Sequence, residues 1–176
     1  MALTLVALIG LNIIDLRLPK AKAKVELGAA VVDAVAVANT SHTGSCLCGA
    51  VSYRAVGLSD IWYCHCKQCQ KLTGRYIAAA GVKREKLEIT GEVNWLPISE
   101  KSNSGHCKSC GSYMFWDAHS SDTVSILAGS IDDTQGLAVK GHIFVSEKGD
   151  YYEINDGLPQ YETYPPEGTR PEEVLD

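Results

Sequence analysis

The chain is 176 residues long, with 45% hydrophobic and 21% charged residues, a composition typical of one globular domain with a core of its own. A net charge of −5 argues against a nucleic-acid partner held by bulk positive charge, and the apolar stretch over residues 1–14 is shorter than the ~20 residues that cross a membrane. All seven cysteines lie in three tight clusters rather than in a disulfide pattern. We therefore expect a cytoplasmic protein whose partners include neither nucleic acid nor a membrane.

The first part of the chain differs in composition from the rest. Residues 1–40 are rich in Ala, Val and Leu and contain no Cys, Trp or Tyr, and a polar stretch over residues 39–44 marks the boundary. We expect an N-terminal extension of uncertain structure over residues 1–40, in which residues 20–38 are the candidate for a helix. The domain proper is predicted over residues 41–161, followed by an acidic, proline-rich tail over residues 162–176.

Short strands separated by glycines are predicted through the middle of the chain. Apolar and polar residues alternate over residues 50–56 and 86–90, and β-branched or aromatic residues are concentrated in seven further stretches. These are residues 61–63, 76–82, 93–96, 112–116, 123–127, 142–145 and 151–154. The pattern indicates a mainly β fold of antiparallel sheets, arranged as a sandwich or barrel.

Two cysteine pairs, each followed by glycine, are typical of metal-binding turns. They are Cys46-Leu47-Cys48-Gly49 and Cys107-Lys108-Ser109-Cys110-Gly111. Both sulfurs of such a turn bind one metal, and the glycine lets the backbone bend so that amide groups approach the thiolates. Neither pair fills a tetrahedron alone, so the four cysteines are predicted to form one structural zinc site. The alternatives are two reduced pairs without metal, or an oxidised Cys107–Cys110 redox pair.

The remaining cluster offers three sulfurs within six residues: Cys64, Cys66 and Cys69. Three sulfurs around one metal leave a fourth position open, and a thiol bound there loses its proton near neutral pH because the cation stabilises the thiolate. We therefore interpret these cysteines as ligands of a catalytic zinc that holds a substrate sulfur as a nucleophile. The alternatives are an iron–sulfur cluster, whose usual spacings differ, and a closed structural site. Candidates for the fourth ligand of a closed site are His65, His106 and His142.

Taken in order, the three clusters resemble one known family, the glutathione-dependent formaldehyde-activating enzymes, also called the centromere protein V domain family. The matching stretches are residues 44–53, 64–74, 106–111, 142–144 and 156–159. The resemblance covers about residues 42–161 and implies a β-tent, in which packed antiparallel sheets surround a structural zinc. It also implies two zinc ions per chain, a structural one at the two cysteine pairs and a catalytic one at the three-cysteine cluster.

The same resemblance implies a carbon–sulfur lyase-type enzyme that acts on a glutathione–aldehyde adduct and forms S-hydroxymethylglutathione from glutathione and formaldehyde. The alternatives are a non-catalytic, zinc-structured protein-binding module and a thiol-based metal or redox sensor. The small-molecule partner would be a thiol such as glutathione, whose carboxylates need hydrogen-bond donors. The candidate donors, each also typical of an ordinary surface position, are Lys67, Gln68, Gln70, Lys71, Thr73 and Arg75.

Aromatic residues in and near the predicted strands are assigned mainly to the core, with the lining of a pocket as the alternative. They are Trp62, Tyr63, Trp95, Tyr113, Phe115 and Trp116. His142, at the start of a predicted strand, is interpreted as a histidine whose ring is satisfied by hydrogen bonds.

Overall fold

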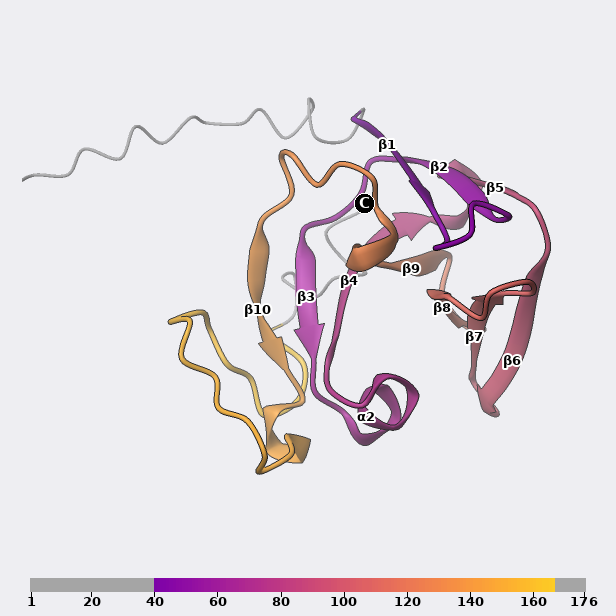
Figure 1. Ribbon diagram of the computed structural model, residues 1–176. Helices are drawn as coiled ribbons and strands as arrows, with labels where there is room; N and C mark the ends of the chain where they lie inside the picture. The colour runs from indigo at the N-terminus through magenta and orange to yellow at the C-terminus, as the bar shows by residue number, and fades with distance from the viewer. Residues whose placement is uncertain (1–39, 167–176) are drawn as a thin grey trace, which may run out of the picture. The chain divides into compact units, whose positions relative to one another are not determined.

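The computed structural model describes residues 40–166, so the predicted helix over residues 20–38 and most of the tail lie outside the described residues. Strands dominate the described part (Figure 1). The strands are β1 Ser41–Ser45, β2 Ser52–Val56, β3 Ile61–Cys64, β4 Ile77–Lys83, β5 Leu87–Thr90, β6 Val93–Ser99, β7 Ser102–Cys107, β8 Tyr113–Ala118, β9 Thr123–Leu127 and β10 Val139–Ile143. The helices are α2 Lys67–Thr73 and the 3-10 turns η1 Arg84–Lys86, η2 Ala128–Ser130 and η3 Val145–Glu147.

The strands form two sheets. One has three strands in the order β1-β2-β5, and the other has seven in the order β10-β3-β4-β9-β8-β7-β6. Neighbouring strands run antiparallel in both sheets, except that β10 pairs parallel with β3 at one edge of the larger sheet. The prediction of a mainly β fold with packed antiparallel sheets is therefore confirmed, and the parallel edge pair is the exception to it.

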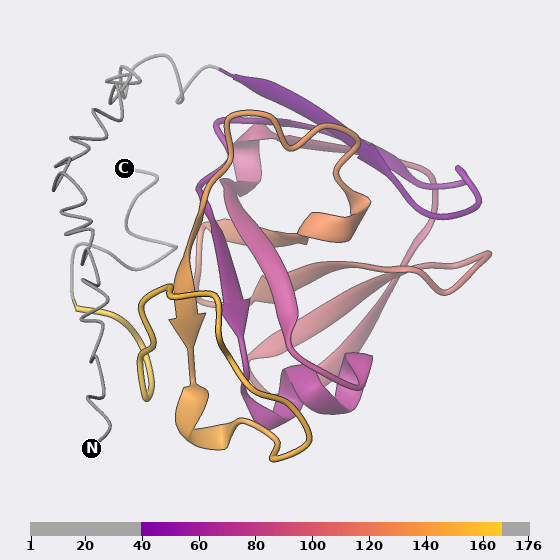
Figure 2. The same cartoon turned by 60° about the vertical axis from the view of Figure 1, so that its left-hand side comes forward.

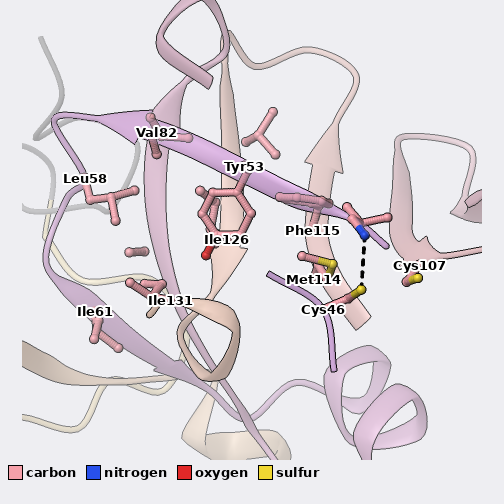
Figure 3. Close-up of a cluster of buried hydrophobic side chains, with 14 residues drawn as sticks. Cys46, Tyr53, Leu58, Ile61, Val82, Cys107, Met114, Phe115, Ile126 and Ile131 are labelled. Carbon is pink, nitrogen blue, oxygen red and sulfur yellow. Dashed lines mark hydrogen bonds between the residues drawn. The ribbon is translucent and has the colours of Figure 1, made fainter. Parts of the chain in front are cut away.

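The hydrophobic core lies where the two sheets face each other (Figure 3). On β2, Tyr53 and Ala55 are buried while Ser52 and Arg54 are exposed, as the period of two along a strand requires. The Tyr53 ring meets the fully buried Phe115 ring of β8 edge to face, with centroids 5.5 Å apart. Cys46 and Cys107 belong to the same buried cluster, so the core reaches the two cysteine turns.

Several local predictions differ from the structure. The helix α2 and the strands β1 and β7 were not expected, and residues 151–154 form no strand. The side chains of Tyr151 and Tyr152 instead reach Gly74 and His65 through hydrogen bonds, which fixes this stretch as a loop. Strand preference reflects how well a side chain packs on a sheet, and these aromatic residues find their partners outside one.

The stretch after η3 returns along the edge strand β10 (Figure 2). The His142 N–H donates to the Pro159 carbonyl at 2.8 Å, and the Tyr161 N–H donates to the His142 carbonyl at 2.9 Å. Gly141 permits this close approach, because a methyl group there would meet the Pro159 carbonyl oxygen. Among the helices of residues 40–166, none has the length and apolar character needed to cross a bilayer.

Candidate active site and metal centres

The two cysteine pairs meet at one point, although 59 residues separate Cys48 from Cys107. The four sulfurs of Cys46, Cys48, Cys107 and Cys110 all lie within 4.8 Å of one another. Cys46 and Cys107 are buried, whereas Cys48 and Cys110 are exposed. The cluster therefore joins the hydrophobic core to the surface.

Each cysteine turn is closed by a glycine in the left-handed conformation. Gly49 and Gly111 both have φ of 75°, and their N–H groups donate to the Cys46 and Cys107 carbonyls at 3.0 and 2.9 Å. The Val51 N–H points at the Cys46 sulfur from 3.2 Å (Figure 3). Such turns aim backbone dipoles at the sulfurs and so favour their thiolate form.

The proton affinities of the two exposed sulfurs move in opposite directions. The Ser112 hydroxyl and N–H lower the pKa of Cys110 to about 5. The Ala50 N–H acts to lower the pKa of Cys48, but the neighbouring Cys110 and Cys46 sulfurs outweigh it and raise that pKa to about 12. Like-charged thiolates at this spacing repel one another, and a bound cation relieves that repulsion.

The second cluster forms where β3 ends and α2 begins. Cys64 closes β3, Cys66 is the N-cap of α2, and Cys69 lies in its first turn, buried. The Cys69 N–H donates to the Cys66 sulfur at 3.4 Å, so the cap itself places two of the sulfurs together. All three sulfurs lie within 4.8 Å of one another, and among the described residues no histidine nitrogen or carboxylate oxygen joins this group.

In this cluster the pKa of one thiol is lowered and the pKa values of the other two are raised. Hydrogen bonding with Cys64 and then with Cys69 lowers the pKa of Cys66 to about 2, while the neighbouring Cys66 raises the pKa of Cys64 to about 12. The Cys64 and Cys66 sulfurs and burial raise the pKa of Cys69. The trio thus prefers a single negative charge, and a divalent cation would be needed to hold three thiolates.

His65 lies between two of these cysteines, and its ring points away from them into a buried row of polar groups. Its Nε2 lies 2.8 Å from Nδ1 of His142, and its Nδ1 lies 2.6 Å from the Tyr152 hydroxyl. His142 Nε2 lies 2.9 Å from the Asp156 carboxylate. Both ring nitrogens of each histidine are therefore engaged, which confirms the interpretation of His142 as a satisfied buried histidine.

One arrangement of protons gives every group in this row a hydrogen-bond partner. The Leu158 N–H, and then the His142 ring, hold the pKa of Asp156 below its usual range, so its carboxylate accepts from His142 Nε2–H. When His142 carries its single N–H at Nε2, its Nδ1 accepts from Nε2–H of His65, and Nδ1 of His65 accepts from the Tyr152 hydroxyl. Burial raises the pKa of Tyr152, so its hydroxyl stays protonated and is able to donate. Burial lowers the pKa of His65 to about 4, which agrees with a neutral His65 ring in this arrangement.

A cavity of about 260 Å³ opens beside the three-cysteine cluster. Its walls come from β3, α2, β4, β8, β9, β10 and the stretch that follows β10. The lining residues are Trp62, Cys64, Cys66, Gln68, Cys69, Ile77, Ala79, Gly81, Trp116, Ser125, Ile143, Phe144 and Tyr164. A larger hollow of about 600 Å³ contacts Cys46 of the other cluster. We place the candidate active site at the smaller cavity, because only there do all three sulfurs of a cluster form part of the wall.

Phe144, in the wall of this cavity, has an unusual backbone conformation. Its φ is 58°, and within residues 40–166 it is the sole non-glycine residue with positive φ. A bulky residue pays about 1–3 kcal/mol for such a conformation, so the surroundings must enforce it. The Phe144 N–H donates to the Thr163 carbonyl at 3.0 Å, and its ring packs edge to face on Tyr164 with centroids 4.8 Å apart.

Both clusters fit zinc by the chemistry of their donors. Four soft thiolates make a closed tetrahedral set, and three thiolates leave one position for an exogenous ligand. Each of the buried cysteines, Cys46, Cys69 and Cys107, belongs to one of these two sulfur groups. The cysteine clusters are thus able to hold metal ions.

Comparison with known proteins identifies the family. The family model of the glutathione-dependent formaldehyde-activating enzymes matches residues 41–147. This chain belongs to that family. A crystal structure of a Rhodobacter sphaeroides protein is similar at 19% identity, over 55% of this chain and 97% of that chain, with a TM-score of 0.45. None of the curated proteins matches the chain.

The expected donors for glutathione carboxylates are spread around the candidate active site rather than gathered in it. Of the six candidates, Gln68 alone lines the cavity beside the three cysteines. Arg75 lies over the Tyr76 and Tyr152 rings, with its guanidinium carbon 4.8 Å from each centroid. The Gln70 amide donates to the His65 and Glu147 carbonyls, and Thr73 donates to the Cys69 carbonyl. Lys67 and Lys71 are exposed.

The aromatic residues divide between core and cavity. Phe115 belongs to the hydrophobic core, and Tyr63 packs against that core cluster. Trp62 and Trp116 line the cavity, and Trp95 is 38% exposed. His106, a candidate fourth ligand, instead bonds Ser104 and the Gly111 carbonyl and stacks on Tyr113. Sequence reasoning assigned no role in the site to Tyr152 or Phe144, although both lie in predicted strands and Phe144 lies in a stretch that resembles the family. Their roles depend on the path of the chain after β10.

Proposed function

We propose that this chain is an enzyme of the carbon–sulfur lyase type that joins a thiol to an aldehyde, with glutathione and formaldehyde as the reactants that the family description names. In the direction of synthesis the sulfur–hydrogen bond breaks and a sulfur–carbon bond forms. The carbonyl double bond opens at the same time, and the thiol proton ends on the new hydroxyl oxygen. No oxidant or reductant is needed.

One observation carries the proposal: the three sulfurs of Cys64, Cys66 and Cys69 form a single group in the wall of a cavity. We assign these residues as the ligands of a catalytic zinc. When bound, the metal would accept an exogenous sulfur in its open position and favour the thiolate form of that sulfur. The chain itself orients the three ligands through the α2 cap, and its apolar walls exclude water from the reacting atoms.

The other four cysteines are assigned a structural role. Cys46, Cys48, Cys107 and Cys110 would hold a second zinc that ties the start of a domain over residues 41–161 to its middle. Their continuity with the buried core supports this assignment, because a closed four-thiolate site lends its binding free energy to folding. In this proposal the two sheets form the β-tent of the family.

The test is the addition of glutathione to formaldehyde by zinc-loaded protein, followed as loss of free thiol. Because the two reactants also combine unaided, each rate is compared with buffer alone. We expect acceleration by the wild type, none by Cys66→Ser, and unchanged acceleration by His119→Ala, whose exposed residue lies outside the site. Equal rates with protein and with buffer would sink this reaction.

A second candidate function is a protein-binding module without catalysis. It is favoured by β6, the outermost strand of the larger sheet, where Trp95 and Leu96 are 38% and 43% exposed. Exposed apolar residues on an edge strand are a common surface for strand pairing. Capture of a protein partner that survives Cys66→Ser but is lost in a Trp95→Ala/Leu96→Ala double variant would support this function.

A further inference from the structure

Apart from the three sulfurs themselves, the cavity beside the cysteine cluster is mainly apolar and has no charged side chain in its wall. Its walls beyond the sulfurs are chiefly side chains of Trp62, Ile77, Ala79, Trp116, Ile143 and Phe144. Among the described residues that line it, none is Lys, Arg, His, Asp or Glu, and Gln68 and Ser125 are the only neutral polar residues besides Tyr164. The Gln68 amide nitrogen already donates to the Ile98 carbonyl at 3.3 Å.

This lining offers no partner for the charged groups of glutathione, and the cavity is larger than formaldehyde needs. Glutathione carries two carboxylates and an ammonium group, and burying a charge against apolar walls is costly unless it is paired. Formaldehyde has a single carbon and would leave most of 260 Å³ empty. An apolar cavity of roughly 150 Å³ already accepts benzene. The space therefore suits a group of aromatic size joined through a short link to the reacting atom.

The backbone conformation of Phe144 indicates that the shape of the cavity is fixed by specific contacts. Its left-handed conformation is held by the bond to Thr163 and places its ring in the cavity wall and against Tyr164. Trp62 of β3 is buried, and it also packs against Tyr161, with ring centroids 6.0 Å apart. The stretch after β10 thus supplies one aromatic side of the cavity and braces another.

We propose that the substrate of this site carries an uncharged apolar group, of about benzyl size, next to its reacting sulfur or carbonyl carbon. The inference rests on the proposed thiol–aldehyde addition and names its substrate class. The apolar group comes either from the thiol or from the aldehyde. In both cases the sulfur–carbon bond forms, the carbonyl opens and the thiol proton moves to the new hydroxyl oxygen.

Binding is tested first, without any reaction. The chain has three tryptophans, and Trp95 lies outside the cavity, so in a Trp95→Phe background the tryptophan emission, excited selectively over tyrosine, comes from the two cavity tryptophans. Benzyl alcohol, which has neither thiol nor aldehyde, is titrated into the zinc-loaded protein. We expect a saturable change, with the apparent Kd raised at least tenfold by Ala79→Leu and several-fold by the milder Ala79→Val. The matched control Ala138→Leu, at an exposed position, should leave the Kd unchanged.

Addition rates then distinguish the source of the apolar group. The pairs are benzyl mercaptan with formaldehyde, glutathione with phenylacetaldehyde, and glutathione with formaldehyde, each corrected for buffer. We expect one apolar pair to exceed glutathione with formaldehyde at least tenfold in kcat/KM. Saturation by glutathione at lower concentration than benzyl alcohol, no saturable benzyl alcohol binding, or acceleration of the glutathione–formaldehyde pair alone would overturn the inference. Benzyl alcohol binding without acceleration of any pair would reject the addition reaction while leaving the apolar site in place.

Discussion

Nε2 of His65 lies 2.8 Å from Nδ1 of His142, across 77 residues of sequence. The two residues belong to neighbouring chain segments because β10 runs parallel to β3, which brings Ile143 beside Cys64. Through Asp156 the same row of hydrogen bonds reaches the stretch that returns along β10. The turn that carries Cys64 and Cys66 is thereby fixed from behind by the C-terminal part of the domain.

Replacing His142 tests this buried row. In His142→Ala the fully buried His65 loses its acceptor, and an unsatisfied buried polar group costs about 1–3 kcal/mol. We expect the free energy of unfolding in urea to fall by at least that amount, since a cavity is also left behind. The control is His119→Ala at an exposed position, expected to stay within about 0.5 kcal/mol of the wild type. Equal stabilities of the two variants would contradict the assigned role.

A second prediction concerns pH. Burial, followed by the influence of His142, lowers the pKa of His65 from 6.5 to about 4. Between these values the unfolded chain binds a proton that the native state does not, so the free energy of unfolding falls as the pH is lowered from about 6.5 to about 4. Above and below that window His65 contributes no pH dependence to the free energy of unfolding. At about 1.4 kcal/mol per pH unit the loss over the whole window is on the order of 3 kcal/mol, of which about 2 kcal/mol falls above pH 5.

The matched variant for this experiment is His65→Gln. Protonation of the cysteine thiolates also weakens metal binding in acid, but it does so in both proteins. The difference between their urea unfolding free energies at pH 7, 6 and 5 therefore isolates the histidine. A smaller pH dependence is expected in the variant, and parallel curves would count against a neutral His65 in the native state.

The sheet pattern was predictable from sequence where strands alternate or carry β-branched residues, as β2 and β9 do. It was not predictable for β1 and β7, because Ser41–Ser45 and Ser102–Cys107 are polar and become strands through their partners. The helix α2 did leave a signal. Good helix formers follow Cys66, and Gly74 ends the helix with φ of 82°.

The grouping of the cysteines followed from their spacing, whereas the cavity did not. A turn of three or four residues places its own sulfurs together wherever it lies in the fold. The cavity wall joins residues as far apart as Trp62 and Tyr164. That proximity depends on the parallel pairing of β10 and on the return of the chain beside it. No local pattern in the sequence encodes either feature.

The connection between β5 and β6 is predicted to support the four-cysteine cluster. Gly91, with φ of 97°, packs on the Ala50 carbonyl behind the first cysteine turn, and the neighbouring Glu92 carbonyl accepts from the Lys108 N–H of the second. A methyl group in Gly91→Ala would clash with Ala50 in addition to the left-handed strain. We expect a loss of about 3 kcal/mol or more in unfolding free energy and faster metal release to a chelator.

The control for that variant is Gly136→Ala. Gly136 has a similar φ of 88°, but a methyl group there meets nothing within 4 Å. Its cost should be the backbone strain alone, about 1–2 kcal/mol, with no change in metal release. If both variants lose the same stability and release metal at the wild-type rate, the connection does not brace the cysteine turns.

The two cysteine clusters are expected to respond differently to loss of one ligand. Cys107 is buried in the core, so Cys107→Ser should lose the structural metal and destabilise the fold by on the order of 5 kcal/mol, a part of the ~10–16 kcal/mol that structural zinc contributes to zinc-finger peptides. Cys66 lies at a partly exposed helix cap outside the core cluster. Cys66→Ser should therefore lose one metal per chain and the addition activity while remaining folded.

Metal analysis of the purified proteins, together with thermal unfolding, decides between these outcomes. All seven cysteines belong to the two clusters, so each variant serves as the other's control. The expected ratios are two zinc ions per wild-type chain and one per Cys66→Ser chain with a nearly unchanged Tm. Cys66→Ser protein that retains the full metal content would show that the three-cysteine cluster binds no metal. If Cys107→Ser keeps both its metal and its Tm, the four sulfurs do not hold the fold together.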